Sequence, residues 1–253
     1  MKGFRVHRNI ALALTAATLF TVLPPAQARV VVDGTRVIYP AARREVTINV
    51  RNPDSKPSLV QAWLDTGDAH SRPGEAKVPF VLTPPLFRLD PSKVQSLRLV
   101  YTQDPIPQDR ESLFWLNVLD IPPRAAANPD APNQLELAFK HRMKVFLRPP
   151  GLPGSAADAP GKLTWKLVSK DGKLVSLQAS NPTAWHVSLI GVAVTLGGQT
   201  LSAKADMVAP FSSGSFDLPE PLTATTGTAA IEYAFMNDFG GSEKGTATTA
   251  ATP

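Results

Sequence analysis

Histidine is the residue type best suited to metal binding and to proton transfer near neutral pH. The chain has four, His7, His70, His141 and His186, and no two of them lie at the short spacing typical of a zinc site. Cysteine is absent, which excludes a disulfide framework and thiolate metal ligands. The sequence therefore predicts neither a metal site nor a cofactor.

Motifs for covalent or phosphoryl-transfer chemistry are also missing. The chain contains no Gly-x-Ser-x-Gly nucleophile elbow and no glycine-rich phosphate loop. Its carboxylates are scattered over turns and strand ends, where a solvated surface role is expected. We therefore expect a protein that is not an enzyme and has no small-molecule substrate. A catalytic site assembled only in three dimensions is the alternative.

One segment, Leu135–Leu147 and the adjoining Arg148, alternates between apolar and polar residues for about 45 Å of extended chain. Ordinary strands are about 5–6 residues long. A long strand could simply serve both ends of one sheet. Alternatively, Leu135, Leu137 and Phe139 form an apolar edge beyond the core of the domain, and a partner protein covers that edge by adding a strand.

The first 28 residues read as an export signal. Lys2, Arg5 and Arg8 precede the apolar stretch Ile10–Leu23, and Ala26-Gln27-Ala28 supplies the small residues of a cleavage site after Ala28. A membrane anchor is the alternative, but the stretch is shorter than the ~20 residues that span a bilayer. Cleavage would remove three basic residues and lower the net charge from +5 to about +2. The high pI therefore does not indicate a nucleic-acid partner.

Period-2 patterns dominate the rest of the chain, which predicts an all-β protein. Seven strand-like segments in about 120 residues are typical of an immunoglobulin-like sandwich. These segments are Val30–Tyr39, Arg44–Arg51, Ser58–Asp65, Val78–Leu82, Val94–Tyr101, Leu113–Ile121 and Leu135–Leu147.

A second, smaller β domain follows a proline- and glycine-rich stretch. We expect an N-terminal domain over residues 29–149, a hinge over 150–161 and a C-terminal domain over 162–241. Strands are predicted at Leu163–Val168, Leu174–Ala179, His186–Leu196 and Thr228–Phe235, with a type I′ turn at Asp171-Gly172. Residues 242–253 contain no large apolar residue, which predicts a disordered tail.

The segment Ile106–Pro123, with Glu111-Ser112-Leu113-Phe114-Trp115-Leu116-Asn117-Val118-Leu119-Asp120-Ile121-Pro122-Pro123 at its centre, resembles the signature of the periplasmic chaperones of the chaperone–usher pathway, the PapD-like family. Further similar segments are Thr35–Tyr39, Val60–Trp63, Thr83–Pro85, Lys144–Pro149, Ser180–Thr183 and Asn237–Gly241. The resemblance implies two immunoglobulin-like domains in a boomerang, with a cleft between them. It also implies a periplasmic protein that binds, folds and caps incomplete fimbrial subunits and delivers them to an outer-membrane usher.

The resemblance also implies roles for individual residues. Arg36 and Lys144 correspond to the cleft cations that anchor the C-terminal carboxylate of a subunit. A guanidinium fork and an ammonium are both suited to bind a carboxylate. Asn133, Leu135, Leu137 and Phe139 correspond to the donor strand, which completes a subunit that lacks its last strand. The exposed edge could also support self-association of the free protein.

Two further sets of residues carry family roles. Glu111, Arg148 and Asp238 correspond to an ion network between the domains. Leu59, Gln61, Thr83, Pro84, Pro85 and Arg98 correspond to the surface that contacts the usher, although packing and turn formation could explain them too.

The chain differs from many relatives in that it cannot form a disulfide in the second domain. The short stretch Pro122–Asn133 resembles the short-loop branch of the family, which is associated with rod-like pili. The alternative function is a secreted immunoglobulin-like adhesion or carbohydrate-binding module, which would bind a glycan or a surface without an incomplete subunit.

Overall fold

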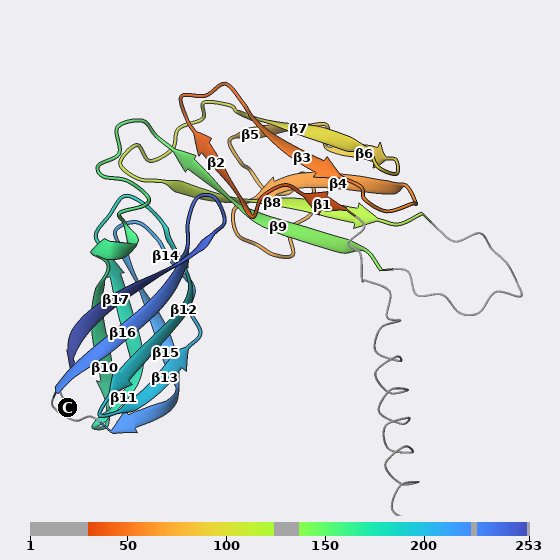
Figure 1. The fold of residues 1–253 in the computed structure, drawn as a ribbon. Coiled ribbons are helices and arrows are strands. Elements are labelled where there is room, and N and C mark those ends of the chain that lie inside the picture. The colour runs from red at the N-terminus through yellow and green to blue at the C-terminus, as the bar shows by residue number, and fades with distance from the viewer. Residues whose placement is uncertain (1–29, 124–136, 224–226, 252–253) are drawn as a thin grey trace, which may run out of the picture.

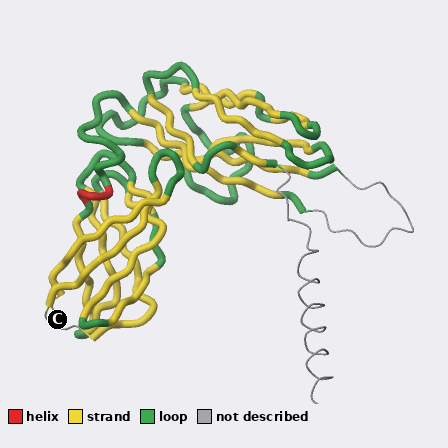
Figure 2. The backbone as a smooth tube through the Cα atoms, in the orientation of Figure 1, coloured by secondary structure: helices red, strands yellow, loops and turns green. Residues whose placement is uncertain are grey.

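The computed structural model describes residues 30–123, 137–223 and 227–251 as two β-sandwiches set at an angle to each other (Figure 1). Strands dominate both domains, as Figure 2 shows. The one helix among the described residues is a single 3-10 turn at Pro160–Lys162. The sequence-based prediction of an all-β, two-domain protein is therefore confirmed. No helix in the described ranges is long and apolar enough to cross a membrane.

The first domain pairs a four-stranded sheet with a five-stranded sheet. The first sheet has the order β1 (Val31–Val32), β3 (Val46–Arg51), β7 (Val94–Tyr101), β5 (Phe80–Thr83). The second has the order β2 (Arg36–Pro40), β9 (Phe139–Arg148), β8 (Ser112–Ile121), β4 (Ser58–Asp65), β6 (Leu86–Leu89). Fully buried side chains such as Tyr39, Leu97, Leu99, Leu116 and Leu147 fill the space between the sheets.

The predicted strand Val30–Tyr39 is in fact two strands in different sheets. β1 pairs antiparallel with β3, whereas β2 pairs parallel with β9. Gly34, at φ +84°, lies in the turn between them and supplies a left-handed conformation that residues with a Cβ adopt at a cost. Asp33-Gly34 is a typical turn signal between two apolar runs, but the local pattern does not show that the chain changes sheet there.

The predicted strand Leu135–Leu147 is only partly matched by β9 (Phe139–Arg148). This strand begins at Phe139, and Leu137 precedes it outside any strand. The predicted donor residues Asn133 and Leu135 lie outside the described residues. The predicted strand also includes residues 137 and 138. These two residues are described but have no ladder partner, so this part of the prediction is wrong.

The second domain also consists of two sheets. One has the order β10 (Thr164–Lys170), β11 (Lys173–Asn181), β15 (Ser212–Thr223). The other has the order β13 (Gln199–Ala203), β12 (Val187–Leu196), β16 (Gly227–Met236), β17 (Ser242–Ala251), and β14 (Met207–Val208) also pairs with β12. Leu174, Leu177 and Ile231 are fully buried between the two sheets.

The predicted hairpin at Asp171-Gly172 is confirmed. Both residues have positive φ, at +52° and +72°, as a type I′ turn requires, and Lys170 and Lys173 pair across it. The sequence did not indicate β15, which contains Pro219 and Pro221. These prolines are compatible with a strand because β15 is at the edge of its sheet.

The prediction of a disordered tail is wrong for residues 242–251, which form β17. This strand pairs with β16 along its whole length, from Ser242 opposite Met236 to Ala251 opposite Gly227. A Cβ at position 245 would overlap the ring of Tyr233, so a glycine is needed there. β17 can form without large apolar residues of its own because its ladder with β16 holds it and the core residue Tyr233 covers it.

The predicted hinge over residues 150–161 packs on the second domain. Ala159 is fully buried in that core. The carbonyl oxygen of Pro160 accepts a hydrogen bond from the Tyr233 hydroxyl at 2.9 Å, and that of Pro153 accepts one from Trp185 Nε1 at 2.9 Å. Proline and glycine therefore mark an ordered connection here.

Candidate functional site

Arg36 and Lys144 are direct neighbours on the face of the sheet that lies outside the first core. β2 and β9 run parallel, and their register pairs Arg36 with Lys144. Their flanking residues, Val37 and Val145, are buried in the core, which directs the two cations to the opposite face. The structure thus brings the two predicted anchor residues together.

Arg36 reaches the second domain. Its Nη1 donates a hydrogen bond to the carbonyl oxygen of Met236 at 3.1 Å, and its guanidinium lies 5.8 Å from the centre of the Phe146 ring. The Nε atom is buried and has no hydrogen-bond partner among the described residues. Burial lowers the pKa of Arg36 and the nearby Arg148 lowers it further, while Asp238 and Glu111 oppose this shift.

Lys144 differs from the two other cations that precede it on the same face of β9. Arg142 forms an ion pair with the buried Asp65 at 2.7 Å, and Lys140 donates to the carbonyl oxygen of Ala69 at 2.5 Å. The Lys144 ammonium lies 5.6 Å from the centre of the Trp115 ring. Within the described ranges it has no ion-pair or hydrogen-bond partner.

The electrostatics of this pair favour a bound anion. Burial lowers the pKa of Lys144, Asp206 of the second domain opposes the shift, and the positive charge of Arg36 adds to it. Two partly buried cations side by side repel each other, and Arg36 Nε still lacks an acceptor. A carboxylate between them would relieve the repulsion and accept charge-assisted hydrogen bonds.

Glu111, Arg148 and Asp238, which the sequence suggested as a network, form one at the junction of the domains. Arg148 Nε lies 2.5 Å from Glu111 Oε1, and its two terminal nitrogens lie 2.6 and 2.7 Å from the carboxylate of Asp238. Burial opposes the charge of Arg148, but the hydrogen bonds with Asp238 and Glu111 prevail and raise its pKa. Such a forked pair fixes orientation as well as position.

His186 is a member of this network that sequence reasoning missed. Glu111 Oε2 accepts a hydrogen bond from the His186 backbone N–H at 2.8 Å and lies 3.1 Å from the ring nitrogen Nδ1. The backbone N–H of Glu111 donates to the carbonyl oxygen of Ala184 at 2.9 Å. The sequence signal was the position of His186 shortly after the family-like segment Ser180–Thr183.

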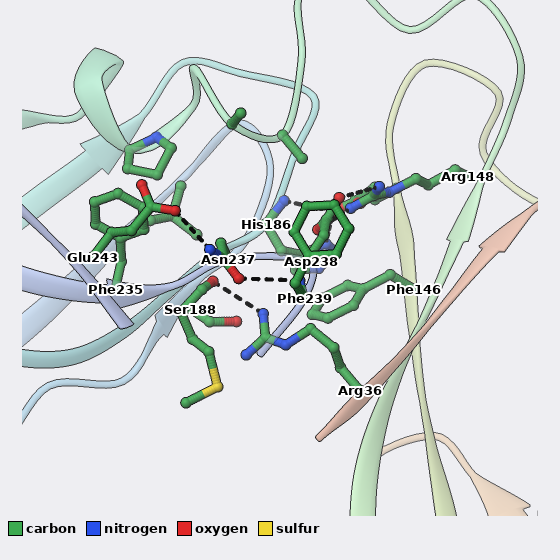
Figure 3. Close-up of a pocket in the computed structure, with 16 residues that line it drawn as sticks. Arg36, Phe146, Arg148, His186, Ser188, Phe235, Asn237, Asp238, Phe239 and Glu243 are labelled. Carbon is green, nitrogen blue, oxygen red and sulfur yellow. Dashed lines mark hydrogen bonds and ion pairs between the residues drawn. The ribbon is translucent and has the colours of Figure 1, made fainter. Parts of the chain in front are cut away.

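A cavity of about 130 Å³ between the domains is lined by Glu111, Arg148, Asp238 and His186 (Figure 3). Arg36 and Phe146 reach it from the first domain, and the segment from Phe235 to Phe239 lines it from the second. A further contact at the junction joins Arg110 to Phe211, whose ring centre lies 5.0 Å from the guanidinium. No group of three or more metal-binding side chains occurs among the described residues.

The start of β9 has one open edge. On one side, Phe139–Leu147 pairs with Asp120–Ser112 of β8. On the other side, β2 pairs only with residues from Lys144 to Arg148. The main chain from Phe139 to Met143 therefore has no strand on that side within the described part of the chain.

The apolar residues of β9 continue past the core along one face. Met143, Val145 and Leu147 are buried in the first domain. Phe139 and Leu137, farther along the same parity, have exposures of 50% and 52%. The predicted donor residues that the structure describes therefore lie at an open edge and on an exposed surface.

The six residues predicted to contact an usher lie on both sheets of the first domain and on the connection between β5 and β6. Leu59 and Gln61 lie on β4, opposite β6, and Thr83 on β5 is the register partner of Arg98 on β7. Pro84 and Pro85 connect β5 to β6, and the Pro85 carbonyl oxygen accepts a hydrogen bond from the Ala62 N–H at 2.8 Å. Arg98 also forms an exposed ion pair with Glu45 at 2.5 Å.

Comparison with known proteins identifies the family. The model described as "Pili and flagellar-assembly chaperone, PapD N-terminal domain" matches residues 29–153. The model described as "Pili assembly chaperone PapD, C-terminal domain" matches residues 158–247. This chain belongs to the PapD-like pilus-assembly chaperone family.

Individual relatives agree with this membership. The chaperone protein FimB/FhaD of Bordetella pertussis is 41% identical over 245 residues, which cover 95% of this chain and 96% of the relative. The chaperone protein HifB of Haemophilus influenzae is 36% identical over 229 residues, or 88% of each chain.

Solved structures show the same fold. The crystal structure of the YadV chaperone has a TM-score of 0.74 and 36% identity, with 88% of this chain and all of that chain covered. The Salmonella enterica SafB chaperone, solved in complex with the SafA pilin, has a TM-score of 0.69 and 30% identity, with coverage of 90% and 98%. The match to chaperones over both domains favours the chaperone prediction over an adhesion module.

Proposed function

We propose that this protein is a periplasmic chaperone that holds incomplete fimbrial subunits by lending them the start of β9. One observation supports the proposal. No strand of the described chain pairs with Phe139–Met143 on the side away from β8, and the exposed side chains of Leu137 and Phe139 adjoin this open edge. An exposed apolar edge is normally covered or blunted, because it invites pairing with another chain. Here a subunit that lacks a strand would cover it.

The strength of such pairing can be bounded. Each main-chain hydrogen bond gained at the edge contributes about 0.5–1.5 kcal/mol. Burial of a leucine or phenylalanine side chain in the groove of a subunit contributes about 1.5–3 kcal/mol. Costs of association and ordering reduce the sum. The edge thus supplies general affinity, and the apolar side chains select a groove that fits them.

Arg36 and Lys144 provide the second half of the proposed site. Lys144 lies about 17 Å along β9 from Phe139, given a rise of about 3.3 Å per residue. Among the described residues no carboxylate forms an ion pair with Arg36 or Lys144, although Asp238, Glu111 and Asp206 act on them at longer range. A subunit strand paired with the open edge could place its C-terminal carboxylate between Arg36 and Lys144. This anchor would fix the register of the added strand, which main-chain pairing alone leaves free to slip.

The network of Glu111, Arg148, Asp238 and His186 would fix the geometry of this site. Arg148 is the last residue of β9, and Asp238 is two residues beyond Met236, whose carbonyl oxygen contacts Arg36. The same strand that binds the subunit is therefore fixed to the second domain at its end. We infer that the network sets the angle at which the second domain faces the anchor.

Export and delivery complete the proposal. Residues 1–28 read as a cleavable signal and lie outside the described residues, and the family to which the chain belongs assembles pili. Leu59, Thr83, Pro85 and Arg98 are exposed on the first domain, so an usher could bind there while β9 holds a subunit. The Salmonella relative was solved with a pilin bound, which supports a subunit as the main partner.

The test uses Arg36→Ala and Lys144→Ala, each produced with its own signal in cells that assemble the fibre. We expect both variants to fold, to lose the co-purifying subunit from periplasmic extracts, and to leave that subunit to degradation. Arg88→Ala, which removes a cation exposed on β6 and paired with Asp90, is the control and should retain the subunit. Normal subunit levels with both anchor variants would contradict the proposed role.

A further inference from the structure

Phe239 is the most exposed large apolar side chain among the described residues, with 96% of its surface accessible. The other large apolar side chains on the surface have exposures between 42% and 61%. A lone apolar side chain on a surface is common and needs no explanation by itself. Phe239 differs from the other exposed apolar side chains in its position beside the cleft and in the hydrogen-bonded loop that presents it.

The loop that presents Phe239 is closed by hydrogen bonds. The side-chain oxygen of Asn237 accepts from the N–H groups of Phe239 at 3.0 Å and Gly241 at 2.9 Å. The backbone N–H of Asn237 donates to the carbonyl oxygen of Gly241 at 2.9 Å. An aromatic residue on such a loop offers contact area at a low cost in conformational entropy.

Both domains hold the loop in place. Asp238 binds the fork of Arg148 from the first domain. Gly240 has φ +82° and packs so closely on Thr35, the neighbour of Arg36, that a Cβ at 240 would lie 2.5 Å from the threonine hydroxyl. The backbone that presents Phe239 therefore has a fixed place relative to Arg36.

That place is the mouth of the cleft. Phe239, Arg36 and Phe146 line one cavity (Figure 3). Arg36 also donates to Met236, three residues before Phe239. A chain that ends in a carboxylate at Arg36 would pass close to this exposed ring.

We infer that Phe239 is a specificity subsite for an apolar side chain within the last two residues of the bound subunit. The inference rests on the proposed function, since the carboxylate at Arg36 is what brings those residues to the ring. Contact between the ring and an apolar or aromatic side chain would remove apolar surface of both from water. Subunits with polar residues at their ends would lose this contact.

The experiment measures the binding of short labelled peptides of alternating threonine and valine to the full chain by fluorescence anisotropy. One peptide set has phenylalanine at the last or next-to-last position and a free carboxylate, a second set has alanine there, and a third has the phenylalanine with a C-terminal amide. The protein variants are Phe239→Ala, Phe239→Leu, Arg36→Ala and the control Val94→Ala, which shortens a side chain 61% exposed at the start of β7.

We expect wild type to bind one phenylalanine peptide about three- to tenfold more tightly than its alanine counterpart. Phe239→Ala should abolish this preference but keep the preference for carboxylate over amide, whereas Arg36→Ala should lose the latter. Phe239→Leu should restore part of the phenylalanine preference, and Val94→Ala should behave as wild type.

Other results would overturn the inference in distinguishable ways. If wild type prefers carboxylate over amide but does not distinguish phenylalanine from alanine, the subsite is refuted and the proposed function stands. If no peptide binds better with a free carboxylate, the proposed function fails as well. If Phe239→Ala changes only the self-association of the free protein, measured by sedimentation, the ring contacts a second copy instead.

Discussion

Two long strands of the described chain have an open edge, and they differ in composition. β17 is at the edge of its sheet in the second domain, whereas β9 lies between β2 and β8 in the first domain and only its start, from Phe139 to Met143, extends past β2. β17 consists of small and polar residues, and it includes Glu243 and Lys244 near its start. The open part of β9 begins with the exposed Phe139 and follows the exposed Leu137. Proteins blunt edge strands with charged and small residues to prevent unwanted pairing.

Lys140 and Arg142 also lie on the open part of β9, but they belong to the face opposite Phe139 and bind Ala69 and Asp65. The comparison shows that β17 has no large apolar side chain at its edge, whereas one face of the start of β9 has.

The two edges are also held differently. β17 depends on its ladder with β16 and on the packing of Tyr233 across Gly245. β9 is fixed at its end by Arg148, whose side chain is mostly buried between the domains. One strand thus contributes mainly to the stability of its own domain, while the other links the domain junction to an exposed surface.

The largest effect is expected from Arg148→Met, which removes the anchor at the end of β9. The carboxylate of Glu111 has a side-chain exposure of only 1% and would lose its cation. Removal of one partner from a buried ion pair costs about 3–5 kcal/mol. Urea unfolding should show a loss of this size, and Arg98→Met, which breaks an exposed pair, should unfold like wild type. A normal midpoint for Arg148→Met would show that β9 needs no such anchor.

The next effect concerns Phe139→Asp, which gives β9 the charge that blunts other edges. We expect the affinity for the subunit to fall at least about 100-fold, or about 2.7 kcal/mol, because a carboxylate would enter an apolar groove. The unfolding free energy of the free protein should change by less than about 0.5 kcal/mol, since the side chain is half exposed. Thr248→Asp on the exposed face of β17 is the matched control and should not affect capture.

Equal losses of subunit from both aspartate variants would remove the functional distinction between the edges. Full capture by Phe139→Asp would show that the apolar surface at the start of β9 does not contact the subunit. Co-purification of the subunit from periplasmic extracts, quantified against the chaperone, measures both.

A smaller effect is expected from Gly245→Val in β17. The new side chain would collide with the buried ring of Tyr233, whose hydroxyl is held by the Pro160 carbonyl oxygen. Overpacking of this kind costs about 1–3 kcal/mol. Urea unfolding should register the loss while subunit capture persists, and Thr248→Val should be neutral. Loss of capture in a folded Gly245→Val protein would mean that β17 also serves the partner.

Local alternation and the family-like segments predicted much of the fold and of the candidate site. The parity of β9 correctly separated Lys144 from Phe139, and the segments around Arg36 and Asp238 pointed to residues that meet in space. Such predictions succeed where a side chain is assigned to a face by its own strand. They need no knowledge of how the strands are paired.

What the sequence could not provide depends on contacts between distant segments. β17 has no apolar pattern of its own, because its strand is stabilised through β16 and Tyr233. The division of Val30–Tyr39 into β1 and β2 depends on which sheet each part joins. The family-like segment Ser180–Thr183 lies close to His186 in the sequence, but only the fold places His186 beside Glu111, 75 residues earlier.

The central claim is that a partner strand covers β9 from Phe139 to Met143, and hydrogen–deuterium exchange tests it most directly. Exchange of the backbone amides is measured in the free chaperone and in its purified complex with the subunit. We expect the segment from Phe139 to Met143 to exchange much more slowly in the complex, while β17 remains unchanged. Unchanged exchange at the start of β9, or slower exchange only along β17, would contradict the account.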